Sequence, residues 1–365
     1  GRLEPTDPVT ITGAGMNSTV IHGRDADFQP AFQIKANVTI NNVEIREFSQ
    51  ALAIASTQSN RTVVLSGVRV TNCGNAAAEL GPAVTNTCST CTLQIASSVI
   101  SNNFSDACGA ISNYGSLSIS NSTLSGNTAL SSYGGAVCSS GIGNSMSVTN
   151  SLIYSNSASN SENGDGGAFD IRSGIYTIAL SEIFGNTAGR GGGALAISFG
   201  TLSLSQTKID GNNANYGGGL ALSGDLVNID QCLIKDNHAT GYGGGMYVWK
   251  SATVSNSSIV NNTAGAKGGG AALNDQTLTI VNSTISGNSA DADGGGLHTS
   301  NDAIARLANV TVSDNTADAD LTDGTLAMGG GFYTSGSSQI QAKNSIVAEN
   351  HDLKAEVFEI VVSDC

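Results

Sequence analysis

The sequence has few aromatic residues, few charged residues and little proline. Phe, Trp and Tyr make up 5% of the 365 residues, the charged residues 12%, and Pro occurs 4 times. This low charge excludes ordinary charge-rich disorder. The 15 Lys and Arg form no basic run, and the net charge of -14 argues against a nucleic-acid partner. No stretch approaches the roughly 20 apolar residues of a membrane helix, so we expect no membrane span.

Glycine is abundant, with 46 residues, and it recurs within a repeated unit. The stretch 282–300 reads NSTISGNSADADGGGLHTS. The same pattern precedes it, with NSSIV at 256–260 and GGG at 268–270, and follows it, with NVTV at 309–312 and GGG at 329–331. A unit of this length cannot bury its own apolar face, so successive units must stack on one another.

Two columns define the repeat: an asparagine, and an apolar residue three positions before it. The asparagines are Asn103, Asn127, Asn156, Asn186, Asn212, Asn237, Asn262, Asn288, Asn315 and Asn350. The apolar residues are Ile100, Leu124, Ile153, Ile183, Ile209, Ile234, Ile259, Ile285, Val312 and Val347. We expect the apolar column to form an inward ladder and the asparagine amides to bond one another at a turn that tolerates left-handed backbone.

A period near 25 residues with short alternating apolar segments predicts a parallel β-helix of about a dozen coils, each adding about 4.8 Å. Parallel crossovers are right-handed in about 98% of cases, so we expect the right-handed form. We predict one all-β domain over 1–365, with irregular coils at 1–72, regular repeats at 73–350 and an end or docking segment at 351–365. The spacing places inserted loops at 157–165 and 318–328, along one edge.

The motif GGAV at 134–137, GGAF at 166–169 and GGAL at 192–195 resembles the repeats of polymorphic outer-membrane-protein-like β-helix surface proteins. The Phe-x-x-Asn tetrad of that family appears here as Ile-x-x-Asn, which departs from the pattern. The resemblance implies secretion and display at a cell surface, in an adhesive or structural role rather than a catalytic one.

The sequence offers no evident catalytic constellation. It lacks the Asp-Asp pair, the Gly-His-Gly and the Arg-x-Lys patterns of pectin-degrading β-helix enzymes. The four histidines, at positions 22, 238, 298 and 351, are interpreted as isolated surface or turn residues. Four aromatic residues gather near one coil edge and could bind sugars by stacking: Tyr216, Tyr242, Tyr247 and Trp249.

We therefore predict a non-catalytic extracellular protein, a structural or adhesive β-helical rod at a cell surface or in a filament. The alternative is a polysaccharide-active or glycan-binding β-helix protein. Turnover of any polysaccharide in a panel would favour the alternative.

Seven cysteines are present, five of them in one region: Cys73, Cys88, Cys91, Cys108 and Cys138. Their clustering predicts local disulfides in an oxidising compartment, with the pairing left open. The CSTC at 88–91 is also half of a zinc-binding pattern, but no second pair stands at ligand spacing.

We expect acidic residues of adjacent coils to stack on one another, at the positions three and five residues after the repeated asparagine. These residues are Asp291, Asp293, Asp318 and Asp320. Like charges at this separation repel, and Lys267, one coil below Asp293, or a Ca²⁺ ion held by oxygen ligands could compensate them. Solvated carboxylates pointing apart remain the simpler reading, and we expect no other cofactor.

The repeat also creates N-glycosylation acceptors, at Asn17, Asn37, Asn60, Asn103, Asn121, Asn256, Asn261, Asn282 and Asn309. The turns of the repeat produce this pattern by themselves, so the signal is weak.

The ends of the chain carry strand-like sequence without a polar cap. The chain starts at Gly1 rather than Met, so we expect further sequence before it. The last segment carries an apolar run and a terminal thiol, including Val357, Phe358, Ile360 and Cys365. We expect these residues to contact a further copy head-to-tail or further domains, with cell-surface glycans as other partners. A private cap formed by 353–362 is the alternative.

Overall fold

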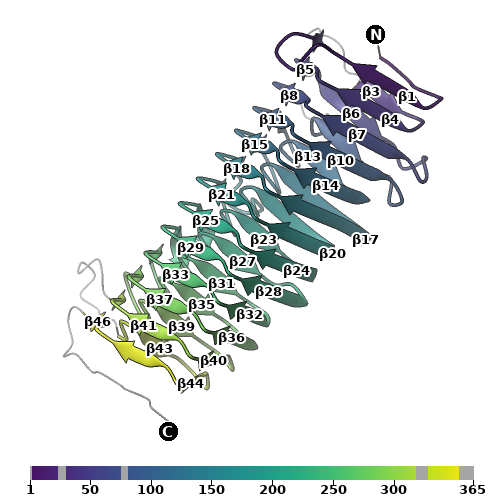
Figure 1. Cartoon of the computed structure of the whole chain (residues 1–365). Helices are drawn as coiled ribbons and strands as arrows, with labels where there is room; N and C mark the ends of the chain where they lie inside the picture. The colour runs from purple at the N-terminus through teal and green to yellow at the C-terminus, as the bar shows by residue number, and fades with distance from the viewer. Residues whose placement is uncertain (1, 24–29, 75–80, 318–327, 353–365) are drawn as a thin grey trace. The chain divides into compact units, whose positions relative to one another are not determined.

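The computed structural model describes residues 2–23, 30–74, 81–317 and 328–352. The fold is an all-β, right-handed parallel β-solenoid of about 11 turns, as the repeat predicted (Figure 1). No helix among the described residues is long and apolar enough to cross a membrane.

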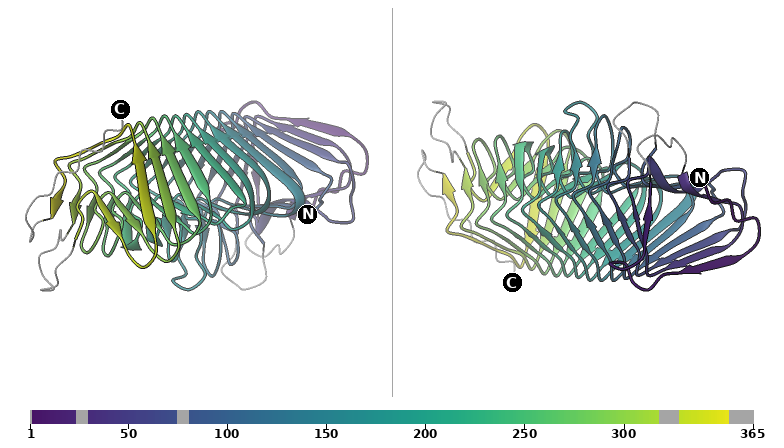
Figure 2. Two further views of the ribbon diagram at one scale, coloured as in Figure 1. Left: turned by 90° about the horizontal axis from the view of Figure 1, so that it is seen from below. Right: turned by 90° about the horizontal axis from the view of Figure 1, so that it is seen from above.

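The chain divides into two compact units, which are described separately. The first comprises Gly1–Glu182 and Thr187–Gly189, and the second Ile183–Asn186 and Arg190–Cys365. Strand β21 (Glu182–Phe184) contains residues of both. The coils contribute strands to three parallel sheets, called here the first, second and third sheets, and the third sheet begins only at β12. In the views of Figure 2 the coils of each unit follow one another in colour order, as stacking at the repeat period requires.

In the first unit, the strands of the first sheet are β1 (Val9–Thr12), β3 (Pro30–Ile34), β4 (Val38–Asn41), β6 (Gln50–Ile54), β7 (Thr62–Ser66), β9 (Val84–Asn86), β10 (Thr92–Ala96), β13 (Ile111–Asn113), β14 (Ser116–Ser120), β17 (Val137–Thr149) and β20 (Phe169–Ala179). The second sheet has β2 (Val20–His22), β5 (Glu44–Arg46), β8 (Arg69–Thr71), β11 (Val99–Ser101), β15 (Thr123–Ser125) and β18 (Leu152–Tyr154). The third has β12 (Phe104–Ser105), β16 (Thr128–Ala129), β19 (Ser157–Ala158) and β22 (Thr187–Ala188).

In the second unit, the strands of the first sheet are β23 (Leu195–Ile197), β24 (Gly200–Ser205), β27 (Leu220–Leu222), β28 (Leu226–Asp230), β31 (Met246–Val248), β32 (Ala252–Ser255), β35 (Ala271–Leu273), β36 (Thr277–Val281), β39 (Leu297–Thr299), β40 (Ile304–Ala308), β43 (Phe332–Thr334) and β44 (Gln339–Lys343). The second sheet has β25 (Lys208–Asp210), β29 (Leu233–Lys235), β33 (Ser258–Val260), β37 (Thr284–Ser286), β41 (Thr311–Ser313) and β45 (Ile346–Ala348). The third has β26 (Asn213–Tyr216), β30 (His238–Tyr242), β34 (Thr263–Ala264), β38 (Ser289–Ala290), β42 (Thr316–Ala317) and β46 (His351–Asp352).

The predicted apolar ladder is confirmed. Ile234 pairs with Ile259, and Ile259 pairs with Ile285, in parallel register along the second sheet. All three side chains are fully buried. Alternation of inward apolar and outward polar residues along each strand therefore fills the interior of every coil, as the period-2 geometry of a strand requires.

Replacing Ile259 by Ala is expected to destabilise the protein by about 2–5 kcal/mol, because the cavity adds to the lost burial. Chemical denaturation followed by circular dichroism would measure the change. As a control, Ile346→Ala removes a side chain of the same type that is 57% exposed and should cost far less. Equal effects of the two substitutions would contradict the register.

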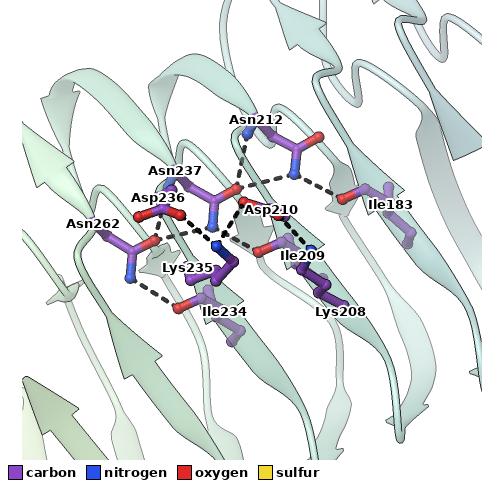
Figure 3. A network of polar contacts seen from close by, with 10 residues as sticks. All are labelled: Ile183, Lys208, Ile209, Asp210, Asn212, Ile234, Lys235, Asp236, Asn237 and Asn262. Atoms are coloured by element: carbon purple, nitrogen blue, oxygen red, sulfur yellow. Dashed lines mark hydrogen bonds and ion pairs between the residues drawn. The ribbon is translucent and has the colours of Figure 1, made fainter.

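A buried asparagine ladder runs beside the apolar one (Figure 3). In each rung the Asn amide donates to the side-chain oxygen of the next Asn and to a backbone carbonyl one coil back. Asn237, for example, donates through Nδ2 to Asn262 Oδ1 at 2.9 Å and to Ile209 O at 3.0 Å. Its backbone N–H also donates to Asn262 Oδ1, at 3.0 Å. The predicted ladder is thus present and satisfies backbone groups at a buried corner.

The left-handed backbone, however, does not lie at the buried asparagines. It lies at the residue before each of them, for example Asn261 with φ of 55°. It also lies at exposed asparagines six positions before the buried ones, for example Asn256 with φ of 49°, which we call the outer asparagine column. These corner residues face solvent, where a short polar side chain in the left-handed region is tolerated. On the same surface Lys235 Nζ lies 2.6 Å from Asp236 Oδ2 and 3.7 Å from Asp210 Oδ1 (Figure 3).

The Gly-Gly motif that recurs in each regular coil allows the backbones of neighbouring coils to approach each other closely. A Cβ on Gly244 would lie 2.4 Å from the carbonyl oxygens of both Gly269 and Thr263, closer than any carbon can approach. Only glycine fits here, which explains the repeated motif.

The inserted loop expected at 157–165 begins in β19 and turns where Gly164 N donates to Asn160 O at 2.8 Å. The second insertion falls largely on 318–327, outside the described residues.

Candidate functional site

The short strands of the first sheet in the second unit turn one residue each toward the outside of the solenoid. Their outward residues form one column: Ala221, Tyr247, Ala272, His298 and Tyr333, in parallel register from coil to coil. Most of the column is nevertheless buried, with His298 only 4% exposed. Residues before the Gly-Gly motifs, such as Lys267, and residues after the short strands, such as Asn274 and Asn301, line a hollow on either side of it. We call this channel the groove.

Four aromatic side chains gather at one end of the groove, and we call them the aromatic shelf: Tyr216, Tyr242, Tyr247 and Trp249. Tyr216 and Tyr242 stack with their ring centroids 5.8 Å apart and 3° between their planes. Trp249 meets Tyr247 edge to face at 4.1 Å. Burial raises the pKa of Tyr247 to about 12, helped by the two other tyrosines. The sequence-based prediction that these four residues gather is confirmed.

The groove contains a pocket of about 310 Å³ that is lined in part by the shelf. Its lining residues are Tyr242, Tyr247, Lys267, Ala272, Leu273, Asn274, His298, Ser300, Asn301 and Ser335. The pocket thus combines aromatic rings from the shelf with hydroxyl, amide and ionisable groups, the mixture typical of a ligand-binding pocket.

His298 is the ionisable group with the most unusual environment in the pocket. Its ring stacks on Tyr333 with centroids 5.7 Å apart and 18° between the planes. Its Nε2 is buried and has no hydrogen-bond partner among the residues that the structure describes. Burial lowers the pKa of the imidazole to about 4; nearby Lys267 lowers it as well, and Asp293 opposes them. The ring is therefore neutral near pH 7, with basic character available at a buried nitrogen.

The interpretation of His298 as an isolated surface or turn residue is therefore wrong. The sequence places it correctly in the strand after Gly-Gly-Gly, but its burial depends on neighbouring coils. The other three histidines lie outside the pocket. His22 Nε2 lies 2.6 Å from Glu47 Oε2, and His238 Nδ1 lies 2.8 Å from Thr263 Oγ1. His351 is exposed.

A cation stands beside His298. Lys267 Nζ lies 2.9 Å from Asp293 Oδ2 and 5.8 Å from the centroid of the Tyr333 ring. Asp293 Oδ1 also accepts a hydrogen bond from Met328 N at 3.1 Å. The predicted pairing of Lys267 with Asp293 is confirmed, and it supplies a fixed ammonium group at the pocket wall.

The opposite wall carries amides. Asn301 Nδ2 donates to the backbone oxygen of Asn274 at 2.9 Å and to its side-chain oxygen at 3.0 Å. Farther along, Lys250 Nζ lies 2.9 Å from Asp225 Oδ1 and 4.9 Å from the ring centroid of Phe199. This wall can therefore offer hydrogen bonds to hydroxyl groups.

The predicted Ca²⁺ site stays a prediction. Asp318 and Asp320 lie outside the described residues, Asp293 is paired with Lys267, and Asp291 takes part in other polar contacts. Among the described residues no group of three or more His, Cys, Asp or Glu could hold a metal ion. Calorimetry with Ca²⁺ and a chelator would test the site.

The cysteines resolve into two disulfides, Cys88–Cys91 and Cys108–Cys138. The first takes up both thiols of the CSTC motif, so it replaces the zinc alternative. Cys73, expected among the disulfide cysteines, is instead a buried free thiol, as is Cys232. Burial raises the pKa of both thiols to about 11, so they are unreactive.

Eight of the nine glycosylation candidates are exposed, and they stay predictions. The exception is Asn103, which is fully buried in the asparagine ladder and donates to Asn127 Oδ1 at 3.0 Å. It cannot carry a glycan in the folded chain. The self-association residues Val357, Phe358, Ile360 and Cys365 lie outside the described residues.

The first unit has a charged cluster of its own, at the side chain of Arg172. Its guanidinium carbon lies 3.7 Å from the Tyr133 ring centroid, and its Nε lies 3.0 Å from Asp170 Oδ2. Burial works to lower the pKa of Arg172, but Asp170 and Tyr133 outweigh it and raise the pKa. The cluster lies beside the Cys108–Cys138 disulfide, since Cys138 pairs with Asp170. Its charges are matched internally, which fits a structural role.

Comparison with known proteins agrees with this fold. Residues 200–358, which include the whole groove, match the family model described as right handed beta helix region. No curated protein sequence matches the chain. A solved structure with a similar fold is that of the periplasmic alginate epimerase AlgG, at a TM-score of 0.50 and 10% identity, covering 86% of this chain and 76% of that one.

These comparisons support a right-handed β-helix but do not confirm the resemblance to polymorphic outer-membrane proteins. They also contradict the prediction of a non-catalytic structural or adhesive protein, because the solved structure that shares the fold is a polysaccharide-active enzyme. The alternative reading, a polysaccharide-active or glycan-binding β-helix protein, is the one that they favour.

Proposed function

We propose that this protein is a polysaccharide-active enzyme whose substrate lies in the groove of the second unit. The observation that carries the proposal is the juxtaposition of the aromatic shelf with the buried, unpartnered Nε2 of His298 in one pocket. Aromatic faces bind the apolar faces of sugar rings, while amides and hydroxyls orient the sugar hydroxyls. The similarity to a β-helix that epimerises alginate gives the proposal its substrate class, a polymer of uronic acids.

The residues suit removal of the proton from C5 of a hexuronate. The imidazole of His298 takes this proton as the C5–H bond breaks, and the electron pair passes into the neighbouring carboxylate. Lys267 stands beside the pocket to stabilise the charge that develops there. Return of a proton from water to the opposite face of C5 gives the epimer, and the imidazolium of His298 then releases its proton to solvent. Loss of the oxygen substituent at C4, which takes up the proton that His298 has accepted, gives an unsaturated residue instead.

Binding of a uronate substrate raises the low pKa of His298. A carboxylate placed beside the ring favours its protonated form and so raises its pKa. The free site then keeps the imidazole neutral, and the bound substrate makes it a stronger base. Both effects assist general base catalysis, which is most effective when the pKa lies near the working pH.

Secretion is part of the proposal. Two disulfides require an oxidising compartment, and the alginate epimerase of similar fold is periplasmic.

Proton NMR of polymannuronate, mixed alginate and polygalacturonate in D₂O would test the function. We expect the protein to exchange or remove the C5 proton of at least one of these polymers. This readout detects epimerisation and elimination alike. Binding without any exchange or product across the panel would reduce the protein to a glycan-binding module, and the enzymatic proposal would fail.

A further inference from the structure

The register of the groove fixes the distance between the shelf and His298. Tyr247 pairs with Ala272, and Ala272 pairs with His298, so two rungs separate them. Rungs in parallel sheets are about 4.8 Å apart, which places the two residues about 10 Å apart along the solenoid axis. One pyranose ring of an extended polysaccharide advances by roughly the height of one rung.

The surface between these two points is open to a chain. Ala272 forms the floor between Tyr247 and His298, and its small side chain leaves the pocket its depth. Asn274 and Asn301, bonded to each other, follow the same direction along one wall. A sugar residue over Ala272 would therefore connect one at the shelf with one at His298.

The shelf is also accessible enough to take a sugar ring. Tyr242 is 37% exposed and Trp249 is 40% exposed, although both contact other rings. A purely structural cluster would bury these two side chains. Tyr247 by contrast is 8% exposed and serves as the base on which they rest.

We infer that the shelf is a distal subsite for the same polymer, at least two sugar residues away from the residue that reacts at His298. The inference rests on the proposed function and specifies its substrate. The substrate is a chain of at least three to four sugars lying along the groove. The protein acts on residues within long chains, and disaccharides reach His298 without the shelf.

Oligosaccharides of two to eight residues from polymannuronate, mixed alginate and polygalacturonate would test this spacing, with both binding and C5 exchange measured. For the wild type we expect kcat/KM to rise with length up to about four or five residues and then to level off. The double variant Tyr242→Ala, Trp249→Ala should lose about tenfold more in kcat/KM on the hexamer than on the disaccharide. Tyr114→Ala, which removes an exposed tyrosine of the first unit, is the control and should change neither.

A shelf variant that weakens the disaccharide as much as the hexamer would overturn the inference while leaving the proposed function intact. Length-independent kcat/KM in the wild type would overturn it too. Failure of every oligomer to bind or exchange would instead refute the proposed function, and the inference with it. Thermal melting of the double variant shows whether a loss reflects unfolding.

Discussion

Replacement of His298 by glutamine is expected to lower C5 exchange by about 10²–10⁴-fold, the usual contribution of a general base. Glutamine is polar and of similar length, so it can fill the site between Tyr333 and Lys267, but it cannot accept a proton. We therefore expect the loss in kcat, with oligosaccharide binding retained within a few-fold. Exchange rates by NMR and titration calorimetry on the same samples would separate the two effects.

The matched control is His238→Gln, which alters a half-buried histidine of the same unit whose Nδ1 lies 2.8 Å from Thr263 Oγ1. It should leave exchange unchanged. Activity of His298→Gln within tenfold of the wild type would contradict the role of His298. A variant that neither binds nor exchanges would be uninformative alone, so His298→Asn, which retains a shorter amide, is measured beside it.

The pH profile gives an independent check with a defined sign. Burial disfavours the charged form of His298 in the free protein and lowers its pKa to about 4, from the 6.5 that is usual for an imidazole. Its basic form is thus fully present at neutral pH and is lost only as the pH falls toward 4. We expect kcat/KM to have its acid limb near that value rather than near 6.5. An acid limb that persists unchanged in the weak residual activity of His298→Gln would assign it to another group.

The repeat predicted the fold because its physical constraints are local and identical in every coil. Three features occupy fixed positions within the coil: the apolar column, the buried asparagines and the Gly-Gly bend. Counting residues along the chain was therefore enough to predict which residues of adjacent coils pair. Ile259 shows this, since its neighbours Ile234 and Ile285 could be named in advance. The left-handed corners were misplaced by one residue because an asparagine can occupy either position.

The functional site could not be predicted in the same way, because it depends on residues that differ between coils. His298 and Tyr247 are both the middle residue of a three-residue strand, at which two neighbouring coils have Ala221 and Ala272. Comparing this position across coils would have placed them in one column. The burial of His298 and the low pKa that results depend further on Lys267, Asp293 and Tyr333, which no local pattern joins.

The inclusion of Cys73 among the disulfide cysteines was wrong for a related reason. Cys73 lies in the same region as the disulfide cysteines, but it faces the interior, where its thiol contacts the backbone oxygens of Ile45 and Thr71. Clustering along the chain does not reveal which side of the coil a residue faces.

Replacing Asn262 by alanine is expected to cost about 4 kcal/mol or more in the free energy of unfolding. Asn262 Nδ2 donates to Ile234 O and to Asn288 Oδ1, both at 3.0 Å. Its Oδ1 accepts from Asn237 N at 3.0 Å and from Asn237 Nδ2 at 2.9 Å (Figure 3). Alanine removes all four bonds and leaves their partners buried, and each unsatisfied buried group costs about 1–3 kcal/mol.

The outer asparagine column provides the control for this ladder. Asn256 is exposed and adopts φ of 49°, so Asn256→Gly keeps the backbone geometry and should change stability by less than about 1 kcal/mol. Both variants would be unfolded in denaturant, and their free energies of unfolding would be compared with that of the wild type at a common denaturant dependence. A small loss for Asn262→Ala would mean that the neighbouring coils close over the gap and satisfy Asn237 and Asn288 by other means. The buried ladder would then be dispensable, and the apolar column alone would hold the coils in register. We expect the opposite, because the amide ladder satisfies a row of corner backbone groups that lies out of reach of water.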